Sequence, residues 1–194
     1  GIGLAIAKGL AVAGANVVPA GRRGELAKTA AAEIERAGGK ALGHPVEVTN
    51  RESLQALLTA SIAKFGSVEI LVNSAGTTKR TPSLQVPDDE WNNTMETNLT
   101  GTLRACQVFG RHMIERSYGR IINIASLSSF LALFEVAAYS ASKAAVASLT
   151  KSLAIEWAKH GVCVNAIAPG VFRTDLNTNL LDGTPRGKEF LART

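Results

Sequence analysis

Ile121-Ile122-Asn123-Ile124-Ala125-Ser126 is a short, mostly apolar run that ends in a serine. A helix-length segment at 138–159 follows it, and a second apolar run occupies 162–168 before Pro169-Gly170. Short apolar runs that alternate with helix-length segments are typical of parallel strands covered by helices. The stretch therefore predicts an α/β fold.

The same alternation extends toward the N-terminus. We predict strands at 16–20, 41–46, 68–73, 121–125 and 162–168. The predicted helices are 2–13, 24–37, 51–65, 87–98, 100–116 and 138–159. No internal repeat or linker interrupts this order, so we interpret residues 1–194 as a single domain.

Composition narrows the class of protein. Hydrophobic residues make up 46% of the 194 residues, which is enough to bury a sizeable core. No uncharged apolar stretch reaches the roughly 18 residues of a membrane span, and no export signal precedes the first helix, so we predict a cytoplasmic protein. The net charge of +5 is spread along the chain, which argues against a nucleic-acid partner.

Cysteine and histidine form no pattern typical of a disulfide or metal site. Cys106 and Cys163 are far apart without C-x-x-C spacing, and we predict that both are buried as small apolar residues. His44, His112 and His160 are dispersed. The sequence therefore predicts no metal.

Both ends of the chain lack an expected strand. Gly1 stands directly at a helix entry, and no strand follows the one predicted at 162–168. We therefore expect the first and last strands of the sheet to be missing from this chain. Residues 176–194 contain Gly183, Pro185 and Gly187 between short helical stretches and are predicted to form a flap over a site.

Tyr139 and Lys143 are four residues apart in the predicted helix and so share one face. An ammonium group stabilises a nearby phenolate, which makes the phenol useful for exchanging a proton with an alcohol or ketone oxygen. Taken singly, such pairs more commonly belong to a solvated helix face. Ser126, thirteen residues before Tyr139 at the end of a predicted strand, favours the catalytic interpretation.

Two further features favour a dinucleotide. Gly1-Ile2-Gly3 opens a helix whose N-terminal amides favour an anion such as a pyrophosphate, although glycines also begin many helices that bind nothing. Arg22 and Arg23 follow the strand where NAD-binding folds usually carry an acid for the ribose hydroxyls. An arginine there can pair with a 2′-phosphate, which favours NADP(H) over NAD(H); the alternative is a pair of surface arginines at a helix start.

Over almost its whole length the chain resembles the short-chain dehydrogenase/reductase family. Gly1 and Gly3 match the last two glycines of the family's TGxxxGxG turn, and 73–76 match its NNAG turn with serine as the second residue. Ser126, Tyr139 and Lys143 match its catalytic serine, tyrosine and lysine, including the spacing. The resemblance implies a Rossmann-type, doubly wound parallel sheet in three α/β/α layers.

The resemblance also implies roles for four residues. Tyr139 would exchange a proton with the substrate oxygen, and Ser126 would hold that oxygen by a hydrogen bond. Lys143 would assist the tyrosine and bind the ribose of the nicotinamide, while Asn98 would support a proton relay through water and the lysine. For Asn98 the alternative is a structural cap.

Residues that match the family's cofactor contacts are spread along the chain. Glu47 replaces the family's usual aspartate at the adenine, so a surface carboxylate is the alternative there. The resemblance implies an NAD(P) cofactor, and the two arginines favour NADP(H), with NAD(H) as the alternative. The predicted cofactor-binding residues are Gly1, Ile2, Gly3, Arg22, Arg23, Glu47, Val48, Asn73, Ala75, Gly76, Tyr139, Lys143, Pro169, Gly170, Val171 and Thr174.

The substrate is suggested by a basic loop. Lys79 and Arg80, in a loop that resembles those of gluconate 5-dehydrogenase-like and deoxygluconate dehydrogenase-like members, could bind the carboxylate of a sugar acid, and Ser128 is a further candidate. An exposed loop at a subunit contact would explain the two cations nearly as well. A 3-ketoacyl-carrier-protein reductase, which shares the catalytic residues, is the alternative enzyme.

Three more interpretations concern assembly and activity. Apolar residues lie on more than one face of the helices 100–116 and 138–159, including Leu149, Leu153, Ile155 and Trp157, and predict a partner surface. The resemblance implies that the partner is a further copy, in a homotetramer or homodimer. A non-catalytic NAD(P)-binding scaffold or sensor is the alternative from another class. Without its first strand, this chain could also fail to fold or to bind cofactor alone.

Overall fold

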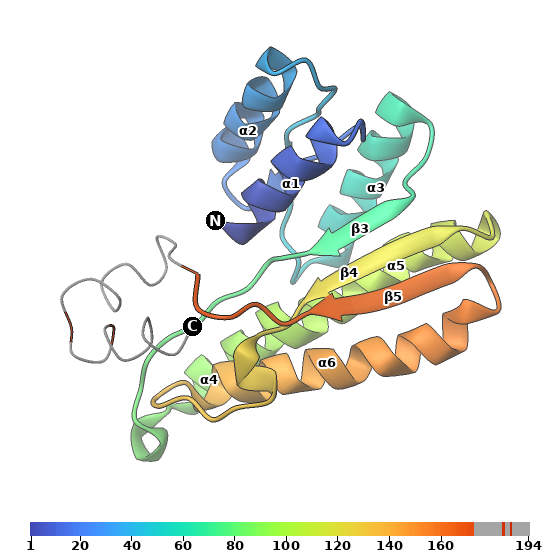
Figure 1. Cartoon of the computed structure of the whole chain (residues 1–194). Helices are drawn as coiled ribbons and strands as arrows, with labels where there is room; N and C mark the ends of the chain where they lie inside the picture. Colours follow the sequence, from blue (N-terminus) through green and yellow to red (C-terminus); the bar gives the residue numbers. More distant parts are fainter. Residues whose placement is uncertain (173–183, 185–186, 188–194) are drawn as a thin grey trace.

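A computed structural model describes residues 1–172, 184 and 187, in which helices and strands alternate as predicted (Figure 1). The strands are β1 (Ala20–Gly21), β2 (His44–Pro45), β3 (Ile70–Asn73), β4 (Gly119–Ile124) and β5 (Val162–Ile167). The main helices are α1 (Ile2–Val12), α2 (Gly24–Arg36), α3 (Arg51–Phe65), α4 (Asp88–Met95), α5 (Gly101–Glu115) and α6 (Ala137–Ala158). Three short helical turns lie at Ser83–Gln85, Glu96–Thr100 and Leu127–Ser129.

All strand pairs in the described residues are parallel. One sheet has the order β3-β4-β5, and a separate pair joins β1 to β2. In the larger sheet Asn73 lies opposite Asn123, and Ile124 lies opposite Ile167, so that the three strands end at the same edge. The predicted parallel α/β architecture is confirmed.

Helices cover both faces of the strands, as the neighbouring Val17 and Val18 illustrate. Because successive side chains of an extended segment point to opposite faces, Val17 packs against α1 and α2, whereas Val18 joins the core formed with α3, α5 and α6. Two cores thus lie on opposite sides of the strands. The three-layer α/β/α prediction is confirmed.

The first two strands are shorter than predicted because of Pro19. Hydrogen bonds continue from Val17 N to Lys40 O (2.9 Å) through to Val46 N to Gly21 O (3.1 Å), but Pro19 has no N–H to donate. The pairing therefore consists of a single bridge between Val17 and Ala41, followed by a two-residue ladder.

The structure corrects one sequence prediction about exposure. Cys163 is exposed rather than buried, because alternate residues of β5 face away from α6. On α6, Trp157 packs on Gly110 of α5 and Leu153 is buried within the same core. Ile155 remains 82% exposed on α6.

Membrane spans and metal sites can be assessed for residues 1–172, 184 and 187. Within them, no helix is both long and apolar enough to cross a membrane. The same residues contain no group of three metal-ligating side chains. The predicted flap at 176–194 lies outside the described residues, apart from Thr184 and Gly187.

We expect Gly161→Ala to destabilise the fold by about 3 kcal/mol or more. Gly161 has a φ of 74°, and an added Cβ would lie 2.2 Å from the carbonyl oxygen of Ser117. Gly9→Ala is the matched control: Gly9 lies within α1 with nothing within 4 Å of an added Cβ. That change should stabilise the helix by about 0.5–1 kcal/mol, so a similar loss of denaturant stability in both variants would contradict the prediction.

Candidate active site

The carboxyl ends of β3, β4 and β5 bring distant segments together (Figure 1). Ser126 follows β4, and Leu127 N donates to Pro169 O, which follows β5, over 3.0 Å. The Asn73-Ser74-Ala75-Gly76 turn follows β3 at the same edge. In open α/β sheets the crevice outside the carboxyl ends of the strands is where ligands bind.

Ser126 begins a short helical turn and is only 9% exposed. Its Oγ accepts a hydrogen bond from Ser128 N (3.2 Å), and its own N–H donates to Ser129 Oγ (3.3 Å). The hydroxyl oxygen is thus held in place as an acceptor, through the bond from Ser128 N. Because a hydroxyl both accepts and donates, its hydrogen can still be given to an incoming oxygen.

Tyr139 and Lys143 share one face of α6, as predicted. The Nζ atom of Lys143 lies 5.7 Å from the centre of the Tyr139 ring and donates to Ile124 O at 2.6 Å. Lys143 is 5% exposed, and burial lowers its pKa to about 8. The strand end, the lysine and the tyrosine therefore form one cluster.

Asn98 is fully buried in a π-helical turn between α4 and α5. Its side chain accepts from Thr77 N (2.7 Å) and donates to Thr77 O (2.9 Å) and to Ser142 Oγ (3.0 Å). Both side-chain N–H groups are thus used. The two helices predicted at 87–98 and 100–116 are continuous through this widened turn, which is a form common at functional sites.

Ser142 is a contact that sequence reasoning missed. Its hydroxyl accepts from Asn98 and donates to the carbonyl oxygen of Tyr139 over 2.7 Å. A serine three residues after Tyr139 in a helix can donate to that carbonyl oxygen, so this bond could have been predicted from the spacing. The bond ties the first turn of α6 to Asn98.

Gly76 stands between these groups. A Cβ at Gly76 would lie 3.4 Å from Asn98 Oδ1 and 3.7 Å from Lys143 Nζ. The turn after β3 therefore approaches the buried amide and the ammonium closely. Asn73 begins the same turn, and its Nδ2 donates to Asn123 Oδ1 (2.9 Å), which anchors the turn to the neighbouring strand.

A second polar chain that sequence reasoning missed runs from this turn into α6. The Nδ2 of Asn123, which is fully buried, donates to Thr150 Oγ1 (2.9 Å), and that hydroxyl donates to Val146 O (2.8 Å). Asn123 lies within the predicted strand. A buried side-chain amide needs hydrogen-bond partners for its oxygen and its nitrogen, and this requirement was the available signal.

The start of α1 fits an anionic group. Its cap residue Gly1 provides no side-chain cap, and the first turn holds no acidic residue, so the N-terminal amides meet no competing side chain there. At Gly3 an added Cβ would lie 2.4 Å from Ser74 Oγ and 3.2 Å from Ser74 Cβ, so a larger residue would require the Ser74 side chain or α1 to move. These features, with Gly76 beside Lys143, fit a dinucleotide. Ile2 is the first residue of α1.

The other predicted cofactor residues take different positions. Arg22 and Arg23 are exposed between β1 and α2. Glu47 accepts a hydrogen bond from Thr49 N (3.2 Å), and Val48 packs against Gly101 of α5. Ala75 is exposed in the turn after β3, and Gly170 and Val171 follow β5 next to Pro169, whereas Thr174 lies outside the described residues.

The predicted substrate residues are engaged with other side chains or buried. Lys79 Nζ lies 3.0 Å from Glu90 Oε2, and Arg80 Nη2 lies 2.8 Å from Glu135 Oε2. Ser128 is 6% exposed, and its hydroxyl makes no hydrogen bond in the described structure. A buried hydroxyl without a partner next to Ser126 is suited to a ligand.

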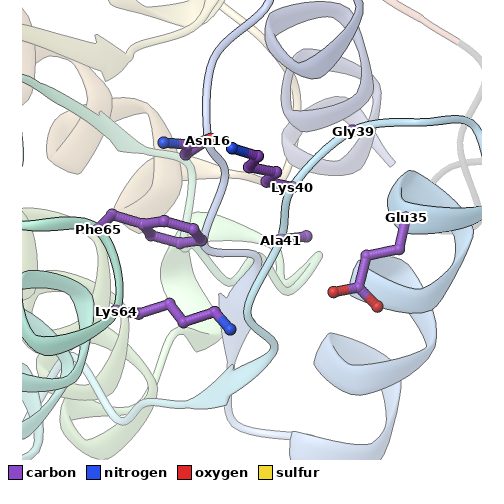
Figure 2. A pocket seen from close by; sticks show the side chains of 7 residues that line it. All are labelled: Asn16, Glu35, Gly39, Lys40, Ala41, Lys64 and Phe65. Atoms are coloured by element: carbon purple, nitrogen blue, oxygen red, sulfur yellow. The ribbon is translucent and has the colours of Figure 1, made fainter.

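A cavity of about 440 Å³ lies elsewhere (Figure 2). Asn16 precedes β1, Lys40 and Ala41 precede β2, and Phe65 ends α3, so the cavity faces the amino ends of the strands. Ser126, Tyr139 and Lys143 do not line it. We therefore assign it no part in the site.

Comparison with known proteins identifies the family. The family model for short chain dehydrogenases matches residues 1–184. The chain belongs to the short-chain dehydrogenase family. Gluconate 5-dehydrogenase of Gluconobacter oxydans is 39% identical over 181 residues, which cover 93% of this chain and 71% of that protein. D-threitol dehydrogenase of Mycolicibacterium smegmatis is 40% identical over 187 residues, covering 96% and 72%.

A solved structure is also close. The crystal structure of a gluconate 5-dehydrogenase from Burkholderia cenocepacia, in complex with NADP and tartrate, is 39% identical and has a TM-score of 0.94. The match covers 100% of this chain and 76% of that chain. The family member described here falls in the gluconate dehydrogenase-like branch and is an NAD(P)-dependent oxidoreductase acting on CH–OH groups.

Proposed function

We propose that this short-chain dehydrogenase prefers NADP(H) and interconverts a secondary alcohol and a ketone of a sugar acid or related polyol. The observation that carries the proposal is the buried Lys143 beside the Tyr139 ring, with its Nζ hydrogen-bonded to Ile124 O two residues before Ser126 at the carboxyl end of β4. The names of the relatives, which include a gluconate dehydrogenase and a threitol dehydrogenase, support this class of substrate.

The proposed cofactor site follows the edge of the sheet. The amides at Gly1 to Gly3 would bind the pyrophosphate, Arg22 or Arg23 the 2′-phosphate, and Lys143 the nicotinamide ribose. Bound there, the nicotinamide supplies the hydride for ketone reduction or accepts it from the alcohol. Glu47 and Val48 stay predicted contacts of the adenine, and Asn73, Ala75, Gly76, Pro169, Gly170, Val171 and Thr174 stay predicted cofactor contacts.

The proposed proton exchange uses the side chains around α6. In reduction, Tyr139 donates its phenolic proton to the substrate oxygen while the Ser126 hydroxyl donates a hydrogen bond to the same oxygen. The ammonium of Lys143 then stabilises the phenolate, and oxidation reverses each step. Asn98 holds the turn after β3 and the start of α6 in place through Thr77 and Ser142.

We expect Arg22→Ala or Arg23→Ala to raise the KM for NADPH about tenfold or more and to leave the KM for NADH nearly unchanged. Only NADPH carries the 2′-phosphate that a guanidinium would bind. Arg36→Ala, an exposed arginine at the other end of α2, is the matched control and should change neither KM. Equal effects of the first two variants on both coenzymes would count against NADP preference.

We propose further that the protein forms a homodimer or homotetramer. We also propose that residues 1–194 form a single domain that acts on a small molecule, and that the protein is cytoplasmic. The exposed Ile155 on α6 is consistent with a subunit contact. Light scattering of the purified protein tests the assembly.

A substrate panel tests the proposed activity. The panel should contain keto-sugar acids, neutral ketoses, a polyol and a 3-ketoacyl thioester, each assayed by the change in NADPH or NADH absorbance. Turnover of the sugar-acid or polyol members is the expected result. Absence of turnover with every member, from protein shown to bind NADPH, would support the non-catalytic alternative instead.

A further inference from the structure

The basic loop after β3, residues 77–82, is held by side chains of two other segments, Asn98 and Glu90. Thr77 is held through both its backbone groups by the side chain of Asn98. Lys79 pairs with Glu90, which also accepts from the Thr81 hydroxyl over 2.9 Å. The Glu90 side chain is only 8% exposed, so removing its cation would leave a buried carboxylate with one partner fewer. We therefore assign the Lys79–Glu90 pair a structural role in holding the loop.

Arg80 has a different kind of partner. Its guanidinium pairs with Glu135, and the two side chains are 42% and 41% exposed. An ion pair between such exposed groups adds little net stability. Because its partner Glu135 is itself exposed, Arg80 can exchange one carboxylate for another at small cost. Lys79 is 68% exposed, but loss of its contact would leave the buried Glu90 without its cation.

Glu135 precedes the helix that carries Tyr139 and Lys143. It stands four residues before Tyr139, and its carbonyl oxygen accepts from Thr81 N over 2.8 Å. Its φ of 62° lies in the left-handed region that non-glycine residues rarely adopt. Such backbone outliers cluster at functional sites, where the surroundings hold them.

We propose that Glu135 is a specificity-determining residue: its carboxylate occupies Arg80 when no substrate is bound, and the carboxylate of an acidic substrate takes its place. The inference rests on the proposed function and adds an internal competitor to it. Through this competition Glu135 weakens the binding of acidic substrates. It has no such effect on a neutral substrate, which carries no carboxylate.

The test compares 5-keto-D-gluconate with its neutral analogue L-sorbose, which carries a hydroxymethyl group in place of the carboxylate. We expect Glu135→Gln to lower the KM for the acid about two- to fivefold and so to raise the acid-to-neutral ratio of kcat/KM. Arg80→Gln should raise the KM for the acid about tenfold or more and lower that ratio. In the Arg80→Gln background, Glu135→Gln should have no further effect on the ratio.

Glu90→Gln is the control for a structural carboxylate. It should lower the unfolding temperature without raising the acid-to-neutral ratio, whereas Glu135→Gln should leave the unfolding temperature nearly unchanged. If Arg80→Gln does not fold, Arg80→Lys replaces it. Ratios that stay constant in the Arg80 and Glu135 variants, or a wild type that prefers L-sorbose, would overturn the proposal.

Calorimetry separates this inference from the proposed function. If the wild type reduces neither compound, the proposed function fails, and binding of D-gluconate to the same variants still tests the exchange. Tighter binding by Glu135→Gln and weaker binding by Arg80→Gln would support it. Equal binding by all three proteins would refute it.

Discussion

Tyr139→Phe should lower kcat by about a thousandfold or more while NADPH binding is retained. The change removes one oxygen, the group that we propose gives its proton to the substrate. Tyr139 is half-buried near Lys143, and its ring can stay in place because phenylalanine has the same shape. Steady-state turnover and fluorescence titration with NADPH measure the two quantities separately.

The chain offers a matched control, because Tyr118 is its only other tyrosine. Tyr118 is 49% exposed, and its ring lies 4.4 Å from the guanidinium of Arg120, a contact that a phenylalanine ring keeps. Tyr118→Phe should retain normal turnover. If Tyr139→Phe keeps more than about a tenth of wild-type activity, a proton donor other than this tyrosine must be sought.

The α/β class and the order of elements could be predicted because each depends on local patterns. The apolar run at 121–125 and the following helix-length segment were sufficient for β4 and α6, which the structure places within two residues of the predicted bounds. The spacing of Tyr139 and Lys143 on a helix likewise depends on helix geometry alone, and their shared face is confirmed.

Features that depend on tertiary contact could not be predicted in the same way. Lys79 pairs with Glu90 of α4 and Arg80 with the distant Glu135, and neither pairing follows from a local pattern, so the sequence indicated the cations without their partners. The contact of Trp157 with Gly110 could not be predicted, because glycine has no side chain to signal it. Which face of β5 is covered depends on α6, and this decided the exposure of Cys163.

Lys143→Met should abolish most turnover and yet stabilise the folded protein at neutral pH. The side chain is 5% exposed, and its pKa falls from 10.5 to about 8 because burial disfavours the ammonium. The shift corresponds to a cost of about 3 kcal/mol to the folded state wherever the lysine stays charged. Methionine fills similar space without that charge, although it loses the hydrogen bond to Ile124 O.

The pH dependence of unfolding identifies the cause. Between about pH 8 and 10.5 the unfolded lysine binds more protons than the folded one, so wild-type stability should rise with pH across this window. The advantage of Lys143→Met should therefore be full below about pH 8 and vanish above 10.5. Lys151→Met, an exposed lysine two turns along α6, should change neither stability nor turnover. A Lys143→Met protein that is less stable than the wild type at pH 7 would mean that the hydrogen bond to Ile124 outweighs the burial of the charge.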